Sequence, residues 1–360
     1  MSGPGEIGFS FGLLTYNAHL FGDFGRMPSL PTYRDRLRAA SIADALRQER
    51  AQGVAIVGLC EIWHPDMATL LQNESGFPYV AHGAFGPMPR PRAGDRLAAG
   101  LESAMARNRA VSPPTVLGCG LMLLSNYPLA GTWYRPYRVQ EPPGASRYVS
   151  KGFLAAVVDP TPGPRLAVML THAQSPENRY GPERQRQMAE LNGVVQAVSR
   201  NHPETAVIVM GDLNVIGEGD EYRQMMAQWG LQDAFRTAHP DAGDAPGFTW
   251  EPRNTLIARW KEETFQEHER LDYIFHTGTV SGFTISVKEC GVRRYRVRWG
   301  DGVSAPTQEE LVVEDAAQSR DGQGLEDLSD HYPLLAQFAF RPGKTGAVAR
   351  DRRRLLDTRF

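Results

Sequence analysis

The feature that most constrains the fold of this 360-residue chain is a short apolar run at 207–210, which stops at Gly211, Asp212 and Asn214. A run of Val, Ile, Val and Met is typical of a strand that is buried on both faces. Gly211 lets the backbone turn where the strand ends. Asp212 and Asn214 are two residues apart, so an extended chain would point both to the same side. The run therefore predicts a covered sheet that carries an acid and an amide at one strand end.

Similar apolar runs predict further strands, and helical stripes lie between several of them. The strands are expected at 13–16, 54–60, 121–124, 153–158, 166–170, 207–210, 272–275 and 334–340. Apolar residues recur with the helical period at 37–46, 188–198 and 222–229. Strands mixed with helices along the whole chain predict an α/β (α+β) fold: a four-layer α/β/β/α sandwich of two packed mixed sheets flanked by helices.

No clean linker divides the chain, so we expect a single domain at 1–341, followed by a basic C-terminal tail at 342–360. Two segments inside the domain, near 83–118 and 293–328, are expected to be long loops. The first is rich in Gly, Pro and Arg, and the second is polar and becomes acidic towards its end. Loops of this length are usually functional lids or insertions.

The composition is that of a globular protein with a sizeable core, with 41% hydrophobic and 22% charged residues. A formal net charge of −2 gives no global attraction for nucleic acid or an anionic membrane. The three cysteines are too few and too scattered for a disulfide framework or a zinc site. The N-terminus has no secretory signal, and no run is long enough to span a bilayer. We therefore expect a cytoplasmic monomer by default, with secretion by another route left open.

Six short motifs share one format, in which a polar residue stands at the end or the start of an apolar strand. A single Glu in such a place is often a capping residue or a member of an ion pair. A single His is often a core residue whose hydrogen bonds are satisfied. Six such motifs in one chain are difficult to explain as structural accident. The polar residues are Asn17, Glu61, His172, the pair Asp212 and Asn214, Asp272, and the pair Asp330 and His331.

The order of these motifs resembles the endonuclease/exonuclease/phosphatase superfamily, the DNase I-like fold of magnesium-dependent phosphodiesterases, over roughly residues 11–340. Within that superfamily the sequence is most similar to the neutral sphingomyelinases, the sphingomyelinase C group. The segments that carry this second resemblance are 120–129, 150–153, 171–174, 248–250, 270–273 and 329–333. The resemblance implies hydrolysis of sphingomyelin to ceramide and phosphocholine by a His-activated water. It also implies transient contact with a phospholipid surface and no obligate nucleic acid.

The chemistry of phosphodiester hydrolysis explains the residue types. The anionic charge must be neutralised and a water must be activated. Hard oxygen ligands suit Mg²⁺, and no dense Cys or His cluster favours zinc. Glu61 is the best single ligand, with Asn17 beside it, and the resemblance implies the same pair, with Asp330 assisting. We expect Mg²⁺ as the cofactor, with Mn²⁺ or Co²⁺ as substitutes.

The catalytic roles follow from the remaining residues. A general base at neutral pH is most easily a histidine, and His331 is chosen because Asp272 can hold its imidazole in the required tautomer. The resemblance assigns the same roles. Asp212 is expected to position the attacking water and Asn214 to hydrogen-bond the phosphoryl oxygens. His172 is expected to contact the phosphate from the opposite side, stabilising charge or aiding the leaving alkoxide.

For several other residues, two interpretations of their role remain open. Lys151 is either a solvated strand start or a phosphate-binding residue beside the site. Five aromatic residues could line a pocket for a quaternary ammonium group or simply pack: Trp63, Phe85, Trp133, Tyr134 and Tyr148. Secreted bacterial sphingomyelinases carry an exposed aromatic hairpin near the chain end. The matching segment here, 293–299, is basic and reads either as a membrane-docking element or as a polar strand.

Three alternatives to the sphingomyelinase prediction remain at this point. They are a metal-dependent endonuclease or exonuclease on the same fold, an inositol-phosphate-type phosphatase, and a catalytically inactive scaffold used for binding. The filled set of polar positions disfavours the inactive scaffold. The net charge of −2 and the lack of an obvious basic, aromatic-interleaved face argue mildly against the nuclease.

Overall fold

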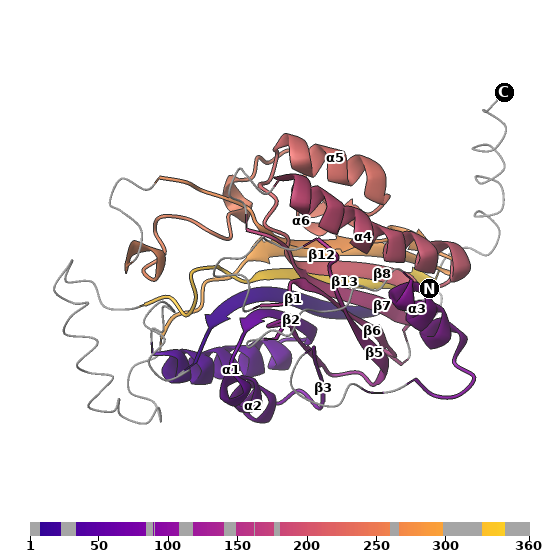
Figure 1. Ribbon diagram of the computed structural model, residues 1–360, viewed down its shortest axis with the longest axis horizontal. Helices are drawn as coiled ribbons and strands as arrows, with labels where there is room; N and C mark the ends of the chain where they lie inside the picture. The colour runs from indigo at the N-terminus through magenta and orange to yellow at the C-terminus, as the bar shows by residue number, and fades with distance from the viewer. Residues whose placement is uncertain are drawn as a thin grey trace, which may run out of the picture.

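The computed structural model describes residues 8–22, 34–83, 89, 91–107, 118–139, 149–161, 163–175, 181–259, 266–297 and 326–342. These residues form two sheets that pack face to face, with helices on both outer faces (Figure 1). This is the predicted α/β/β/α sandwich.

The first sheet has seven strands in the order β11-β12-β13-β1-β2-β4-β3. Its central pair, β1 and β2, is parallel, and the other neighbouring strands are antiparallel. A parallel pair places both carboxyl ends at the same edge of the sheet. The strands are β1 (Phe9–Leu20), β2 (Val54–Ile62), β3 (Tyr79–His82), β4 (Met122–Ser125), β11 (Thr279–Val280), β12 (Phe283–Val292) and β13 (Leu334–Pro342).

The second sheet has six strands in the order β5-β6-β7-β8-β10-β9. Its central pair, β7 and β8, is also parallel, and its other pairs are antiparallel. Both sheets therefore end a parallel pair at an edge where polar residues can collect. The strands are β5 (Leu129–Pro136), β6 (Gly152–Val158), β7 (Leu166–His172), β8 (Ala206–Asp212), β9 (Gln232–Asp233) and β10 (Asp272–His276).

The helices cover the two outer faces. One core cluster joins α1 (Asp35–Ala51) and α2 (Pro65–Glu74) to the first sheet. Another joins α3 (Arg96–Ala106), α4 (Gly181–Asn201) and α5 (Asp220–Trp229) to the second sheet. The short α6 (Ala234–Ala238) contacts β10 and β12. Two 3-10 turns, η3 (Ala245–Gly247) and η4 (Ile257–Arg259), lie between α6 and β10.

The run at 207–210 is buried on both faces, as predicted. Val207 and Val209 belong to the core under the helices, whereas Ile208 and Met210 belong to the core between the sheets. The two sheets approach closely at Gly58 of β2. A Cβ at this position would lie 2.5 Å from Cε of Met210, so only glycine fits without a shift of the neighbouring side chains.

All eight expected strands are present, and helices lie at the three expected places. The strands that the sequence did not predict are β3, β5, β9, β11 and β12, which are short, irregular in burial, or half exposed at a sheet edge. Such strands lack the continuous apolar run that marks a central one.

The prediction of a long loop at 83–118 was wrong in part, because this segment contains the helix α3. Asp95 caps this helix, its side chain accepting a hydrogen bond from the backbone N–H of Ala98. The helix forms because Leu97, Leu101 and Met105 recur with the helical period and are buried. Residues 84–88 and 108–117 of the expected loop lie outside the described residues.

The expected segment at 293–328 is described only at its ends. Within 293–297 the backbone forms one bridge, between Arg296 and Asp327, and no strand. The polar-strand reading is therefore wrong for the described part. Arg294 instead turns to Asp327, and its Nε lies 2.7 Å from the carboxylate. Residues 298–325, with Trp299, and the tail at 343–360 lie outside the described residues.

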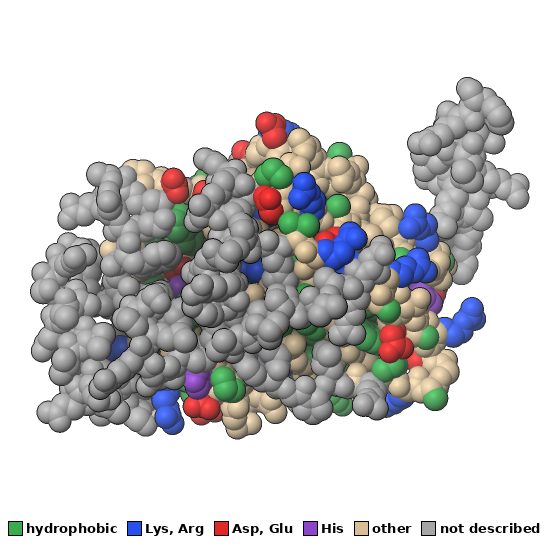
Figure 2. Space-filling view, in the orientation of Figure 1, with side chains coloured by type: hydrophobic (Ala, Val, Ile, Leu, Met, Phe, Trp, Pro, Cys, Tyr) green, Lys and Arg blue, Asp and Glu red, His purple; other side chains and the backbone are tan. Residues whose placement is uncertain are grey.

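On the described part of the face in Figure 2, Lys and Arg side chains are interspersed with Asp and Glu. Among the described helices, none combines the length and the apolar character that a membrane span needs.

Candidate active site

The polar strand ends meet where the two sheets adjoin. In the second sheet the register places Gly152, His172, Asp212 and Asp272 in one row across neighbouring strands. In the first sheet Asn17 pairs with Cys60, next to Glu61. A hydrogen bond from Asn17 to Asp212 joins the two edges. The topology therefore brings together side chains that are up to about three hundred positions apart in the sequence, and five of the six predicted motifs are in these rows. The sixth, Asp330 and His331, directly precedes β13.

Three site residues have a left-handed backbone that non-glycine residues rarely adopt. The φ angles are 49° at His19, 60° at Glu61 and 53° at Asn214. Each of these residues lies at or just after a strand end, and β1 and β2 lose their regular register between Asn17 and Leu20. Unusual backbone of this kind persists only where the surroundings hold it, and it collects at functional sites.

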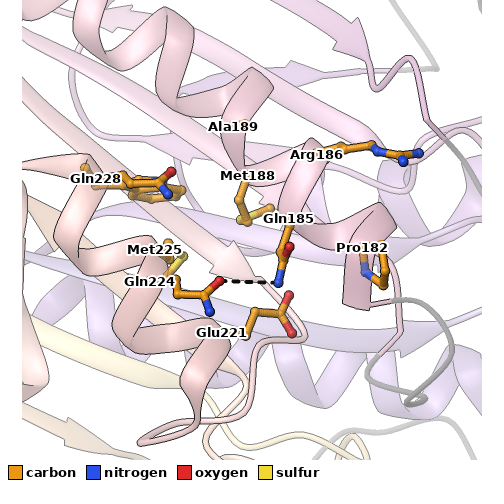
Figure 3. Close-up of a pocket in the computed structure, with 10 residues that line it drawn as sticks. Pro182, Gln185, Arg186, Met188, Ala189, Glu221, Gln224, Met225 and Gln228 are labelled. Atoms are coloured by element: carbon orange, nitrogen blue, oxygen red, sulfur yellow. Dashed lines mark hydrogen bonds between the residues drawn. The ribbon is translucent and has the colours of Figure 1, made fainter.

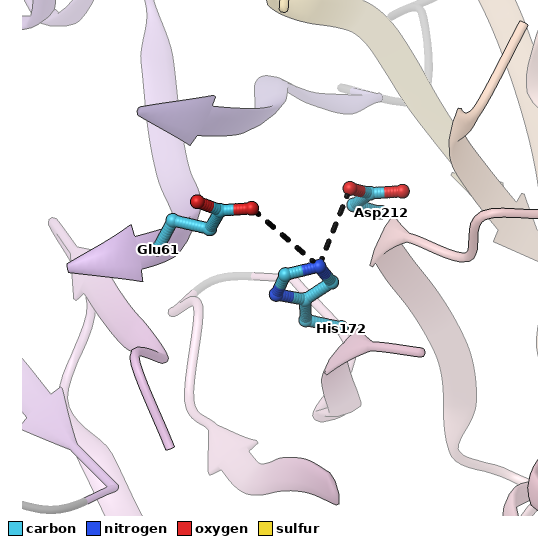
Figure 4. Close-up of side chains that lie close together, drawn as sticks. All are labelled: Glu61, His172 and Asp212. Atoms are coloured by element: carbon cyan, nitrogen blue, oxygen red, sulfur yellow. Dashed lines mark ion pairs between the residues drawn. The ribbon is translucent and has the colours of Figure 1, made fainter. Parts of the chain in front are cut away.

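Asn17 bridges two carboxylates at the centre of the site. Its Nδ2 lies 2.9 Å from Oε1 of Glu61 and 2.9 Å from Oδ2 of Asp212. His172 faces the same two acids, with Nε2 at 3.7 Å from Glu61 and 3.5 Å from Asp212 (Figure 4). One ligand atom from each of Glu61, His172 and Asp212 lies within 4.8 Å of the others, which is a spacing that a metal ion can span.

The pKa values of the two acids are shifted in opposite directions. Burial disfavours the charged form of both. For Glu61 the nearby His19 and His172 outweigh that effect and hold its pKa well below the usual range. For Asp212 burial dominates and the charge of Asp272 adds to it, so its pKa is raised despite the nearby His331. The difference follows the neighbours, because Glu61 is close to cationic and hydrogen-bonding side chains, whereas Asp212 lies beside a second carboxylate, that of Asp272.

His331 is held between two aspartates. Its Nδ1 lies 2.8 Å from Oδ2 of Asp272, and its Nε2 faces Oδ2 of Asp212 at 3.8 Å. Burial alone would lower the pKa of His331, but the charges of Asp272 and Asp212 raise it well above the ordinary value. Asp272 is fixed in turn, because its backbone N–H donates to Thr249 Oγ1 at 3.2 Å.

Lys151 lies inside the site. It is only 8% exposed, and its Nζ lies 2.6 Å from Nε2 of His172. The reading of Lys151 as a solvated strand start is therefore wrong. Burial and the charge of Lys151 lower the pKa of His172 well below its ordinary value.

Asn214 and Asp330 lie at the rim of this cluster. The backbone N–H of Asn214 donates to Oδ1 of Asp212 at 2.9 Å, and its side-chain amide donates to the carbonyl of Ala173. The sequence predicted that Asp212 and Asn214 point to the same side of an extended chain. This reasoning does not hold, because the left-handed backbone at Asn214 interrupts the extended conformation. Asp330 faces His19 at 3.5 Å. Two clusters of described residues have a spacing that a metal ion can span, Glu61 with His172 and Asp212, and Asp212 with Asp272 and His331, and Asp330 belongs to neither.

The comparisons with known proteins agree with this geometry. The sequence pattern of the Endonuclease/Exonuclease/phosphatase family matches residues 14–331. The chain belongs to this family. A 137-residue segment is 31% identical to sphingomyelinase C 2 of Leptospira interrogans, covering 37% of this chain and 20% of that protein. The chain thus matches about a fifth of the length of this curated relative.

Three solved structures share the fold over most of the chain. Sphingomyelinase C from Streptomyces griseocarneus is 25% identical with a TM-score of 0.59, covering 91% of this chain and 99% of that chain. A beta toxin mutant from Staphylococcus aureus with bound magnesium ions is 20% identical with a TM-score of 0.60, covering 91% and 99%. TDP2 of D. rerio, complexed with a single-strand DNA product, is 14% identical with a TM-score of 0.59, covering 91% and 98%. The fold and family predicted from the sequence are confirmed.

Two residues of this family member's site were missed by the sequence reasoning. His19 faces Glu61 and Asp330, and the fully buried Arg38 donates to the carbonyl of His19 at 2.6 Å. The signal for His19 was its position two residues after Asn17 on the same strand. Arg38 stands in a helical stripe and carried no signal.

The aromatic candidates divide into packing residues and one site residue. Trp63 donates from Nε1 to Glu61 at 3.4 Å, and its ring lies 6.2 Å from that of His172. Tyr134 donates its hydroxyl to the carbonyl of Ser150, and Trp133 packs against the core under the helices. Phe85 and Tyr148 lie outside the described residues.

A cavity of about 360 Å³ lies between α4 and α5 (Figure 3). Met188, Met225 and Trp229 supply its apolar lining, and Gln185 and Gln224 border it. All of its lining residues belong to the two helices, and none is a member of the polar cluster. The cavity is therefore separate from the candidate active site.

Proposed function

We propose that the protein is a metal-dependent phosphoric diester hydrolase of the sphingomyelinase C type, which converts sphingomyelin to ceramide and phosphocholine. The observation that carries the reaction class is the arrangement of Asp272, His331 and Asp212 opposite Glu61 and Asn17. It combines a histidine oriented by an aspartate with a carboxylate suited to a hard cation. The substrate is supported by the likeness to two proteins named as sphingomyelinase C.

In this proposal Glu61 and Asn17 hold the metal ion, and Asp330 assists from the side of His19. A carboxylate and amide donor set fits Mg²⁺, with Mn²⁺ or Co²⁺ as substitutes. Nδ2 of Asn17 donates to the two carboxylates, so Oδ1, which accepts from the backbone N–H of His19 at 3.2 Å, is the amide atom that would serve as an oxygen ligand. The bound ion would neutralise the phosphate charge and polarise the phosphoryl group. The beta toxin mutant with bound magnesium supports the choice of metal.

His331 acts as the general base. Its Nε2 takes a proton from the attacking water, while Asp272 keeps the proton of the ring on Nδ1 and stabilises the cation that forms. Asp212 faces the same Nε2 and is placed to accept a hydrogen bond from that water. The water oxygen bonds to phosphorus as the bond between phosphorus and the ceramide oxygen breaks. The ceramide alkoxide leaves with the electron pair of that bond and takes a proton from solvent, and His331 returns its proton to solvent.

The opposite side of the site carries the remaining charge. Lys151 supplies a buried positive charge next to His172, and the two residues together contact the phosphoryl oxygens or the leaving alkoxide. One amide hydrogen of Asn214 donates to the carbonyl of Ala173, and the other can donate to a phosphoryl oxygen. A phospholipid surface is then the natural partner, and contact with it is transient. The monomeric state and the cellular location stay predictions.

A substrate panel tests the proposal. Purified protein with MgCl₂ is incubated with sphingomyelin vesicles, phosphatidylcholine vesicles, supercoiled plasmid and an inositol polyphosphate, each with and without EDTA. We expect phosphocholine release from sphingomyelin, lost with EDTA and restored by excess Mg²⁺. Nicking of plasmid alone would replace the substrate with nucleic acid, and release of inorganic phosphate alone would indicate a phosphatase. Turnover that survives EDTA would overturn the metal-dependent mechanism.

A further inference from the structure

His19 is a buried residue of the site that the proposed reaction does not use. It stands near the end of β1, and only 7% of its side chain is exposed. Its Nδ1 lies 3.4 Å from Oε2 of Glu61 and 3.5 Å from Oδ1 of Asp330. Glu61 belongs to β2 and Asp330 to the segment before β13. One ring nitrogen therefore faces carboxylates from two separate parts of the chain.

The surroundings fix the direction of this ring. The backbone of His19 is left-handed at φ 49°, a conformation that costs energy outside glycine. Arg38 donates to the carbonyl of His19 at 2.6 Å and to that of Leu328 at 2.9 Å. The backbone N–H of His19 donates to Oδ1 of Asn17 at 3.2 Å, and its ring meets that of Phe21 edge-on at 5.0 Å. Arg38 thus ties the strand end of His19 to the segment that carries Asp330.

Among the described residues, the two carboxylates have few other restraints on the same side. Oε1 of Glu61 is held by Asn17, whereas Oε2 meets Trp63 Nε1 at 3.4 Å as well as His19. Oδ1 of Asp330 accepts a hydrogen bond from Ser329 Oγ at 3.2 Å. Within the part of the chain that the structure describes, His19 is the residue whose side chain contacts both Glu61 and Asp330.

We propose that His19 is a positioning residue, which holds the carboxylates of Glu61 and Asp330 in the arrangement that the metal site requires. This inference rests on the proposed function, because it assigns His19 to that same site. The contact needs an N–H at Nδ1, which both the neutral Nδ1-protonated ring and the cation supply. Without it, Oε2 of Glu61 and Oδ1 of Asp330 each lose a restraint, while Ser329 Oγ, which donates to the carbonyl of Asn17 at 2.7 Å, still links this segment to β1. Metal affinity falls as a result, because residues that orient ligands typically contribute 10- to 100-fold.

Three substitutions separate the N–H from the bulk of the ring. H19F keeps a ring without a nitrogen, and H19Q places its polar atoms one bond further out. H19N carries an amide at the level of Nδ1, and Asn also tolerates the left-handed backbone. Binding of Mn²⁺ to the full-length protein is measured from the electron paramagnetic resonance signal of the free ion, followed by competition with Mg²⁺. We expect H19F and H19Q to bind Mn²⁺ at least about 10-fold more weakly than the wild type, and H19N to keep most of the affinity.

His64 offers a matched control close to the site. Its Nδ1 caps α2 by accepting from the N–H of Asp66, and H64N keeps a capping acceptor, so its metal affinity should match the wild type. Wild-type protein that binds no Mn²⁺ would contradict the proposed function itself. Wild-type binding with unchanged affinity in folded H19F or H19Q would overturn only the role of His19. If those two variants fail to fold, H19N decides: retained affinity supports the role, and a tenfold loss in folded H19N overturns it.

Discussion

Nδ1 of His331 lies 2.8 Å from Oδ2 of Asp272, although the two residues are 59 positions apart in the sequence. Asp272 begins β10 directly beside Asp212 of β8, and His331 enters from the segment that precedes β13. The contact therefore joins the two sheets at the site. It also leaves Nε2 as the ring nitrogen that faces Asp212, which is where a base would meet the attacking water.

Replacing the base should remove most of the turnover. We expect H331A to lower kcat by about 10²–10⁴, the usual contribution of a general base. Steady-state hydrolysis of sphingomyelin vesicles measures the loss, and far-ultraviolet circular dichroism checks that the variant is folded. Turnover close to the wild type in folded H331A would show that another group takes the proton.

Removing the orienting charge should move the pH profile. The pKa of His331 is raised by Asp272 and Asp212 against the effect of burial, and a base acts only when it is deprotonated. Activity should therefore rise with pH through that raised pKa. In D272N the pKa of His331 falls, so the acid limb of the kcat/KM profile should shift to lower pH while kcat drops. An unmoved acid limb in D272N would assign it to a different group.

Lys151 should matter for its charge. In K151M the pair with His172 loses its positive charge, and the pKa of His172 should rise towards 6.5 because the repulsion is gone. We expect kcat to fall by about 10²–10³, as for the loss of one buried donor to a developing anion. K151R keeps the charge and should recover part of the rate. Equal activities for K151M and K151R would argue against an electrostatic role.

The sequence predicted the central strands and the residues they carry, because fully buried strands leave continuous apolar runs. The row of His172, Asp212 and Asp272 follows from such strands and their pairing. His19 escaped notice because its side chain reaches Glu61 only through the irregular backbone after Asn17, which no apolar pattern records.

The remaining errors have similar physical reasons. The sequence left two interpretations open for Lys151, because its burial depends on His172 from the neighbouring strand. The half-exposed strand β12, which lies next to the short edge strand β11, has a weaker pattern than the central strands. The helix α3, set among Gly and Arg residues, also has a weaker pattern. A pattern along the chain reports how an element packs, but not which separate elements meet at its end.

Gly211 should be irreplaceable for steric reasons. Its φ is 134°, and a Cβ there would lie 1.9 Å from the carbonyl oxygen of Thr171. We expect G211A to destabilise the fold by roughly 3 kcal/mol or more, because both the backbone and the neighbouring strand must shift. Gly193 in α4 is the matched control, since a Cβ there meets nothing within 4 Å. G193A should stabilise the protein by about 0.5–1 kcal/mol, and urea unfolding of both variants measures the difference.

His82 in β3 should make the stability depend on pH. The residue is buried, and burial lowers its pKa to about 4, below the ordinary value of 6.5. The unfolded chain therefore binds a proton at a higher pH than the folded one. The contribution of the neutral ring to the free energy of unfolding is fully present above pH 6.5 and is lost as the pH falls from 6.5 towards 4.

Between pH 7.5 and pH 5 the wild type should lose about 2 kcal/mol of its unfolding free energy through this residue alone. H82Q does not titrate, so its urea unfolding free energy should fall by about 2 kcal/mol less than that of the wild type over this range. Equal losses in the two proteins would show that His82 does not control this transition.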